Sequence, residues 1–280
     1  MIVKAKAFAP ASIANVAVGF DILGFSFPTV GDTVTVTRLL EPKVIVTKVS
    51  GVISDAIPKD ANKNTAAVAL EALRISEGLS YGFSIEIEKG IPLSSGMGGS
   101  AASAVAAVVA ANSLLERPLN QQKLIEYALQ GEAAASGSIH ADNVAPCMMG
   151  GLCLAVTHDP PNIIQVPVPK EILVVLVHPQ LQIDTKTARS ILKRDLMLSE
   201  HVHQSARLGG FVAACFLNNI PLISTTMLDL IVEPQRKTLI PGFSEAKKKA
   251  LSLGAIGFSI AGSGPSVFAW VVGLENANRV

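Results

Sequence analysis

The feature that most constrains the fold of this chain is the run EKGIPLSSGMGGSAASAVAAVVAA at residues 88–111. Apolar and polar residues alternate at 83–88, which predicts a half-buried strand. Residues 94–100 are all serine or glycine except Met97, and an alanine-rich helix opens near Ser100. A backbone that can lie close to a ligand, followed by the N–H groups and positive dipole end of a helix, forms a site for phosphate. A flexible linker is the alternative, but linkers rarely lie between a strand and so apolar a helix.

Two common phosphate loops do not fit this run. No lysine follows the glycines, as the P-loop requires, and GMGGSA does not complete the dinucleotide-binding pattern G-x-G-x-x-G. PLSSGMGGSAA at 92–102 instead resembles the nucleotide loop of the GHMP kinases (galactose, homoserine, mevalonate and phosphomevalonate kinases), usually P-x-x-x-G-[LM]-[GS]-S-S-[AG]-[AS]. Gly99 stands where the first of the paired serines is usual, which leaves Ser100 as the hydroxyl near the phosphates. The resemblance implies that ATP is held by Asn64, Pro92, Leu93, Ser94, Ser95, Gly96, Met97, Gly98, Gly99, Ser100, Ala101 and Ala102.

Length and composition exclude several classes of protein. With 280 residues, 49% of them hydrophobic, the chain can bury one large core or two medium ones. The net charge is +1, and acidic and basic residues are scattered along the chain. This pattern indicates neither a basic stripe that would bind nucleic acid nor a basic surface that would bind a membrane. The longest apolar runs are far shorter than the ~20 residues of a membrane span, and no signal peptide is evident. Three irregularly spaced cysteines in apolar surroundings indicate buried free thiols. A soluble cytoplasmic protein without nucleic-acid or membrane partners is expected, and a homodimer is left open.

The periodicity predicts a mixture of strands and helices. Strands are expected at 3–7, 33–38, 44–49, 83–88, 152–157, 163–168, 172–177, 255–259 and 267–272, and helices at 64–76, 100–111, 120–135, 187–196, 205–217 and 244–253. The strand at 172–177 is apolar enough to be buried on both faces. Turns are predicted at Gly31-Asp32 and at Glu88-Lys89-Gly90.

The Asp-Pro-Pro-Asn sequence at 159–162 is the best candidate for a domain boundary, and it gives domains 1–160 and 161–280. The mixed pattern predicts an α+β protein. The resemblance implies the two-domain GHMP kinase fold, an N-terminal α/β sandwich with the nucleotide loop plus a C-terminal ferredoxin-like domain, with the site between them. Relatives usually continue past the third motif, so the final helix and strand of the second domain are expected to be missing after Val280.

A second motif, ASIANVAVGFDILGF, lies near the N-terminus. On their own, Asn15 and Asp21 would be turn residues. SxANxxxGFDxxG resembles the form of the first GHMP motif that homoserine kinases carry. This resemblance implies that Asp21 faces the ammonium group of the substrate and Asn15 its other polar atoms. A carboxylate fixed opposite an ammonium group in a partly desolvated cleft forms a strong, charge-assisted contact.

The run EAAASGSIHADNVAPCMMGG, which begins at Glu132, offers a carboxylate, an imidazole and an Asp-Asn pair. Glu132 alone would be a helix-surface residue. The resemblance makes it a Mg²⁺ ligand together with Ser100, and Mg²⁺ keeps enough bound water to need few protein oxygens. His140 and Asn143 resemble the HxDN segment that lies beside the substrate hydroxyl in homoserine kinases. Because an amide cannot accept the hydroxyl proton, we expect Asn143 to orient the hydroxyl, while positioning and charge neutralisation carry the rate. Asp142 is the alternative neighbour of the reacting group.

Two arginines lie in tightly patterned segments, Arg189 in IDTKTARSIL and Arg236 in IVEPQRKTLIP. Alone, each would be a surface salt-bridge residue. Both match the arginines with which homoserine kinases hold the substrate carboxylate, and a guanidinium fork suits a carboxylate in a way that lysine does not. The late loop IAGSGPSVFAW resembles the third GHMP motif and would bring Gly262 to the substrate. His201 and His203, without a third ligand, are expected to be solvated.

Together these resemblances cover nearly the whole chain. They imply an ATP-dependent, Mg²⁺-assisted kinase that converts L-homoserine to O-phospho-L-homoserine in threonine biosynthesis, with Ser100, Glu132 and Asn143 as its catalytic residues. Two alternatives remain, namely another GHMP kinase acting on mevalonate or a sugar, and a non-catalytic member that only binds a ligand.

Overall fold

The computed structural model describes residues 3–52, 57–137 and 139–280. The chain forms two compact units, the first made of Met1–Ser12, Phe25–Leu93 and Gly98–Ile164, the second of Ile13–Gly24, Ser94–Met97 and Gln165–Val280. The domain limits 1–160 and 161–280 stay a prediction, because two short segments from the N-terminal half pack with the second unit.

The predicted mixture of helices and strands is confirmed. The strands are β1 (Lys4–Ala14), β2 (Leu23–Leu39), β3 (Val44–Gly51), β4 (Gly82–Lys89), β5 (Leu152–His158), β6 (Pro161–Val166), β7 (Ile172–Val177), β8 (Ala255–Ile260) and β9 (Val267–Val272). The helices are α1 (Thr65–Ser76), α2 (Gly99–Asn112), α3 (Gln121–Ser136), α4 (Ala141–Met149), α5 (Thr185–Ser190), α6 (Leu198–Phe216), α7 (Ile220–Thr226), α8 (Glu233–Arg236), η1 (Lys237–Leu239), α9 (Phe243–Ser252) and α10 (Gly273–Arg279).

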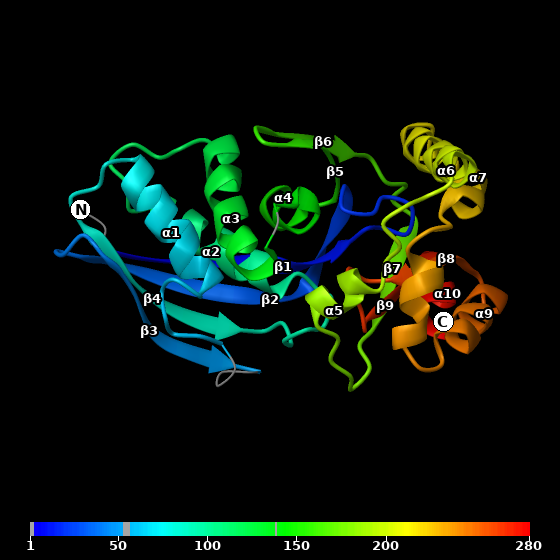
Figure 1. Cartoon of the computed structure of the whole chain (residues 1–280), viewed down its shortest axis with the longest axis horizontal. Helices are drawn as coiled ribbons and strands as arrows, with labels where there is room; N and C mark the ends of the chain where they lie inside the picture. Colours follow the sequence, from blue (N-terminus) through cyan, green and yellow to red (C-terminus); the bar gives the residue numbers. More distant parts are fainter. Residues whose placement is uncertain (1–2, 53–56, 138) are drawn as a thin grey trace. The chain divides into compact units, whose positions relative to one another are not determined.

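A six-stranded sheet runs through the first unit in the order β3-β4-β2-β5-β6, with β1 paired to β2. Strand β4 is antiparallel to β2 and parallel to β3. Helices α1, α2 and α3 pack on one another, and α1 and α2 also contact β4, so this helical layer covers the sheet (Figure 1). Most side chains of α2 are buried, and its many alanines allow the neighbouring helices to approach closely.

The second unit is built around three antiparallel strands in the order β7-β9-β8. The central strand β9 is buried along most of its length, and its Trp270 ring lies 5.7 Å from the ring of Phe211 on α6. The prediction that 172–177 is buried on both faces is wrong, because β7 is an edge strand and Val177 is 53% exposed.

Both predicted turns next to a glycine need correction. Strand β2 continues through Gly31-Asp32 without a break. Gly31 instead allows β1 to lie close to β2, because a Cβ at this position would be 2.2 Å from the carbonyl oxygen of Ala9 on β1. Lys89 is likewise the last residue of β4, so the chain turns only after it.

Some helix limits also differ from the prediction. The helix expected at 187–196 ends at Ser190, and Ile191 and Leu196 beyond it are exposed, so a longer helix would have no apolar face to bury. Helix α6 begins before the predicted residue 205. Helix α4 was not expected, since Pro146 lies inside it and proline disfavours helix interiors. Of the break predicted at 159–162, only Asp159 and Pro160 lie between β5 and β6, which are neighbours in one sheet, and Pro161 already begins β6.

Over the residues that the structure describes, no helix is long and apolar enough to cross a membrane. The prediction of buried free thiols is confirmed for Cys147, Cys153 and Cys215. Burial raises the pKa of Cys147 and of Cys153 to about 12, so both stay protonated near neutral pH. His201 and His203 are exposed on α6, as expected for solvated histidines.

Candidate active site

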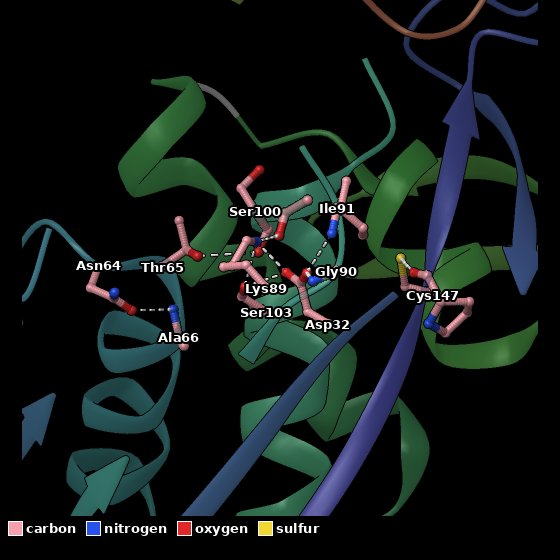
Figure 2. Close-up of polar contacts among 12 residues, drawn as sticks. Asp32, Asn64, Thr65, Ala66, Lys89, Gly90, Ile91, Ser100, Ser103 and Cys147 are labelled. Atoms are coloured by element: carbon pink, nitrogen blue, oxygen red, sulfur yellow. Dashed lines mark hydrogen bonds and ion pairs between the residues drawn. The ribbon is translucent and has the colours of Figure 1, made fainter. Parts of the chain in front are cut away.

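The nucleotide loop enters α2 through a glycine. Gly98, with φ 64°, is the N-cap of this 14-residue helix, so no side chain there binds the N–H groups of the first turn. Such N–H groups, together with the positive end of the helix dipole, can hold a phosphate. Ser100 lies in this first turn, and its carbonyl oxygen accepts a hydrogen bond of 3.1 Å from the Thr65 hydroxyl at the start of α1 (Figure 2). The helix start predicted near Ser100 is confirmed.

Glu132 on α3 lies beside Ser100. Burial raises the pKa of Glu132 to about 7, while the hydrogen bond with the Ser100 hydroxyl and the charge of Lys89 oppose the rise. Helix α3 packs closely on α1 at this point because Gly131 has no side chain, and a Cβ there would lie 2.4 Å from the carbonyl oxygen of Thr65. The structure thus brings together the hydroxyl and the carboxylate that were predicted as metal ligands.

This pair fits a magnesium ion that is also bound by phosphate and water. Among the described residues, no three or more His, Cys, Asp or Glu side chains gather as a metal-binding group. Mg²⁺ does not need such a group, because it usually binds one or two carboxylates, substrate phosphates and several waters. A cation beside Glu132 would also relieve the cost of burying its charge.

Asn143 on α4 lies against the nucleotide loop. Its Oδ1 accepts a hydrogen bond of 2.8 Å from the Ser12 hydroxyl. A Cβ on Gly98 would lie 2.0 Å from Ser12 Oγ and 2.7 Å from Asn143 Oδ1, so the missing side chain lets the loop lie directly on this pair. Asn143 is partly exposed, whereas its neighbour Asp142 is only 4% exposed. Asn143 therefore has the better access to a substrate hydroxyl.

His140 is the N-cap residue of the helix that carries Asn143. Its ring makes an edge-to-face contact with that of His158, with 5.8 Å between the ring centres. The N–H of Ala141 donates to Nδ1 of His158 at 3.3 Å, so both imidazoles lie at the start of α4. The predicted contact of His140 with the substrate stays a prediction.

Asn64 is the N-cap residue of α1. Its Oδ1 accepts from the N–H of Ala66 at 3.1 Å (Figure 2) and from that of Ala67 at 3.3 Å. Its Nδ2 donates to the carbonyl oxygen of Pro58 at 2.9 Å. The residue is 2% exposed. These contacts give Asn64 a structural role, and its contact with a nucleotide stays a prediction.

The first part of the nucleotide loop, Ser94–Met97, packs with the late glycine loop inside the second unit. Gly96 has φ +77°, and a Cβ there would lie 2.3 Å from the carbonyl oxygen of Ala261. The N–H of Ser266 donates to the carbonyl oxygen of Ser95 at 3.3 Å. The nucleotide loop and the late glycine loop are therefore in contact through backbone atoms.

The N-terminal motif forms a strained turn in the second unit. Asn15, Val16, Ala17 and Asp21 all have positive φ, between 45° and 74°, which residues other than glycine rarely adopt. Asn15 holds this turn, because its Oδ1 accepts from the N–H of Asp21 at 3.1 Å and its Nδ2 donates to the carbonyl oxygen of Gly262 at 2.8 Å. Backbone strain of this kind is typical of functional sites.

Both predicted arginines meet this turn. Arg189 makes a bidentate pair with Asp21, with N···O distances of 2.9 and 2.8 Å. Arg236, which is 3% exposed, donates to the carbonyl oxygen of Ala188 at 3.1 Å and to that of Gly262 at 3.0 Å. The structure thus brings together the predicted substrate residues of the second unit.

Sequence reasoning missed Phe20, which lies directly before Asp21. The guanidinium carbons of Arg189 and Arg236 lie 5.3 and 5.1 Å from the centre of the Phe20 ring, within cation–π distance. The signal that could have found it is an aromatic ring beside the carboxylate in a segment of small residues. Asp32 and Lys89 were also missed, because both were placed in turns.

Comparisons with known proteins identify the family of this chain. The model described as GHMP kinases N terminal domain matches residues 64–151, and the model described as GHMP kinases C terminal matches residues 211–280. A homoserine kinase of Xanthomonas campestris is 49% identical over 267 residues, which are 95% of this chain and 82% of that protein. A homoserine kinase of Chloroherpeton thalassium is 45% identical over 283 residues, 98% of this chain and 88% of that protein.

A solved structure has nearly the same fold. The crystal structure of homoserine kinase from Cytophaga hutchinsonii matches with a TM-score of 0.95 at 43% identity, and the match covers 100% of this chain and 88% of that chain.

Proposed function

This chain belongs to the homoserine kinases of the GHMP kinase family, and from this membership we propose that it transfers the γ-phosphoryl group of ATP to the side-chain hydroxyl of L-homoserine. The product is O-phospho-L-homoserine, and the reaction belongs to threonine biosynthesis. Its location in the cytoplasm stays a prediction, and its assembly into a homodimer stays open.

The observation that most supports this substrate is the charged group formed by Asn15, Asp21, Arg189 and Arg236. An amino acid carries both an ammonium group and a carboxylate, and this group offers a carboxylate for the first and guanidinium groups for the second. Mevalonate has a carboxylate but no ammonium group, and a sugar has neither. The ammonium and carboxylate groups of homoserine together would pair with all three charged side chains, Asp21, Arg189 and Arg236.

The first turn of α2 is proposed to bind the phosphates of ATP, with Ser100 and Glu132 holding Mg²⁺. Bound there, Mg²⁺ would neutralise charge on the β- and γ-phosphates. The N–H groups that follow Gly98, which no side chain at the N-cap binds, support this assignment, as does the Ser100–Glu132 contact.

Asn143 is proposed to orient the hydroxyl that attacks. The Ser12 hydroxyl donates to Oδ1 of Asn143. Nδ2 of Asn143 can then donate a hydrogen bond to the oxygen of the homoserine hydroxyl. That oxygen forms the new bond to the γ-phosphorus while the bond to the β–γ bridging oxygen breaks and ADP leaves. The hydroxyl proton passes to an oxygen of the transferred phosphoryl group. Positioning and charge neutralisation then carry the rate.

A coupled assay of ADP release with L-homoserine, mevalonate and galactose, each with and without Mg²⁺, tests the substrate. We expect Mg²⁺-dependent turnover with L-homoserine at a kcat/KM at least about 100-fold above that of the other two. A preference for mevalonate or galactose would identify another GHMP kinase. Binding of ATP without turnover of any acceptor would identify a non-catalytic protein.

Two variants test the assigned roles. Glu132→Gln is expected to abolish Mg²⁺-dependent turnover, because it removes the ligand charge. Asn143→Ala is expected to lower kcat by a smaller factor, on the order of 10- to 100-fold. If Asn143→Ala abolished turnover as completely as Glu132→Gln, with substrate binding unchanged, the orienting role of the amide would be wrong.

A further inference from the structure

A buried ion pair lies under the first turn of α2. Lys89, the last residue of β4, and Asp32 on β2 have side chains that are 6% and 0% exposed, and the ammonium group contacts the carboxylate directly (Figure 2). The strand register explains the contact, because Thr33 pairs with Glu88 and the next position brings Asp32 opposite Lys89. Both residues continue the buried faces of their strands into the helical layer.

The ion pair holds the end of the nucleotide loop. Besides contacting Asp32, Nζ of Lys89 donates to the carbonyl oxygen of Gly99 at 2.8 Å and to the hydroxyl of Ser103 at 3.0 Å. The Ser103 hydroxyl in turn donates to Oδ2 of Asp32 at 2.6 Å. The lysine is thus bound to the start of α2 both through the backbone oxygen of Gly99 and through the side chain of Ser103.

The same ion pair holds the start of the loop. Oδ1 of Asp32 accepts from the N–H groups of Gly90 and Ile91 at 3.1 and 3.2 Å. These two residues directly precede the predicted loop at 92–102. One ion pair therefore fixes the backbone at both ends of the loop.

The contact with Gly99 also orients Ser100. The carbonyl group of Gly99 and the N–H of Ser100 belong to one trans peptide, so they point in opposite directions. Because Lys89 draws the carbonyl oxygen to the buried side, the N–H of Ser100 is turned away from it, toward the end of the helix where a phosphate would bind.

Stability alone gives little reason for such a pair. A buried ion pair is usually no more stabilising than apolar side chains of the same volume. A network whose members are all hydrogen-bonded, however, fixes one backbone arrangement. The Lys89 ammonium contacts Asp32, Gly99 and Ser103, so it would act on a nucleotide through the backbone and not by direct contact.

We propose that the Lys89–Asp32 pair is the positioning device of the nucleotide loop, fixing both ends of the loop so that the first turn of α2 is preset for phosphate. Lys89 and Asp32 are then positioning residues, which do not touch the substrate. The inference rests on the proposed use of ATP.

The test uses the double variant Lys89→Met/Asp32→Asn. It removes both charges and the contact with Gly99, while the asparagine oxygen can still accept from Gly90 and Ile91. The full-length variant is titrated with a non-hydrolysable ATP analogue and Mg²⁺ in a calorimeter. We expect the affinity to fall about tenfold or more, with the KM for L-homoserine changed by less than about twofold. Amide hydrogen exchange at residues 99–103 in the free protein should become faster.

A matched control is available in the second unit. Lys247 on α9 contacts Glu233 on α8, and the Ser259 hydroxyl donates to the same carboxylate at 2.7 Å, which repeats the chemistry of the first pair without a contact to residues 90–103 in these hydrogen bonds. Lys247→Met/Glu233→Gln should lower the unfolding temperature but leave the affinity for the analogue within about twofold. An equal loss of affinity in this control would show a general effect of destabilisation and overturn the inference.

The inference is also overturned if the first double variant folds and binds the analogue as the wild type does. Should that variant fail to fold, Ser103→Ala keeps the ion pair and is expected to weaken binding by about threefold, and unchanged binding would again overturn the inference. A wild-type protein that binds the analogue but does not phosphorylate homoserine would refute the proposed function only, since the affinity ratios would still decide the role of Lys89 and Asp32.

Discussion

Arg189 and Asp21 face each other through two hydrogen bonds, from Nη1 to Oδ2 at 2.9 Å and from Nη2 to Oδ1 at 2.8 Å. In the proposed complex Asp21 binds the ammonium group of homoserine and Arg189 binds its carboxylate. In the free protein these two side chains pair with each other instead. The side chains are 40% and 21% exposed, and an ion pair with this exposure contributes about 1 kcal/mol or less. Homoserine can therefore replace the pair at little cost.

Replacing Arg189 tests this exchange. Arg189→Ala is expected to raise the KM for L-homoserine about 5- to 150-fold, equivalent to about 1–3 kcal/mol of lost charge-assisted bonding, without changing the KM for ATP. Arg189→Lys should recover only part of the loss, because an ammonium group cannot bind a carboxylate bidentately. Arg207, which donates to the carbonyl oxygen of Thr225 at 2.9 Å, provides the control variant Arg207→Ala. A wild-type KM for homoserine in Arg189→Ala would refute the substrate assignment.

Phe20 is predicted to act through the two arginines that flank its ring. Each cation–π contact contributes about 0.5–1 kcal/mol at a partly exposed site, so Phe20→Leu should raise the KM for homoserine about 5- to 30-fold, with little change in kcat. Phe20→Tyr keeps an aromatic face and should retain a KM near that of the wild type. Steady-state kinetics with both variants decides the matter, and equal KM values for the leucine and tyrosine variants would exclude a role for the ring electrons.

The stability of the metal-free protein should depend on pH through Glu132. Burial raises the pKa of this carboxyl from 4.5 to about 7 in the folded chain. Between these values the folded state holds a proton that the unfolded state has lost, so the free energy of unfolding falls as pH rises through this window. The loss reaches about 3 kcal/mol above pH 7. The Glu132→Gln variant has no carboxyl group to ionise at this position, so it should be more stable than the wild type at pH 8.

Urea unfolding of both proteins at pH 5, 6, 7 and 8 without Mg²⁺ measures the effect. The difference in unfolding free energy between wild type and Glu132→Gln should change steadily across this series. Glu126 on the same helix pairs with Lys123 at 2.8 Å near the surface, so Glu126→Gln serves as the control and should follow the wild-type curve. A constant difference for Glu132→Gln would contradict the raised pKa.

The motif residues could be predicted because each belongs to a short contiguous pattern. Asn15, Asp21, Arg189 and Arg236 were each predicted from such a pattern. In the second unit Arg189 pairs with Asp21, and Asn15 and Arg236 both donate to the carbonyl oxygen of Gly262. Their roles with a ligand stay predictions. The packing of segments 13–24 and 94–97 with the second unit could not be predicted, because it depends on contacts between residues that are far apart in the sequence.

Lys89 and Asp32 were missed although the sequence carried a signal for them. Each stands beside a glycine, and this local pattern favoured turns. The alternation of Phe83, Ile85 and Ile87 continues to position 89, which places the lysine on the buried face of β4. A charged residue at an inward position of a strand therefore indicates a buried partner, although the partner itself is fixed only by the register between β2 and β4.

The two adjacent glycines of the loop are predicted to respond differently to a side chain. Gly98 has φ +64°, and its Cβ would lie 2.0 Å from Ser12 Oγ, so Gly98→Ala should strain the backbone and lower kcat/KM for ATP by about 100-fold. The Cβ of residue 99 would face Ile91 and Lys89 at 3.2 and 3.4 Å, on the side of the buried ion pair and away from the phosphate end of α2. Gly99→Ser should therefore keep the KM for ATP within about threefold, since the added hydroxyl replaces no phosphate contact. Steady-state kinetics with ATP as the varied substrate compares the Gly98→Ala and Gly99→Ser variants. A large rise in the KM for ATP in Gly99→Ser would show that the loop geometry differs from the one described.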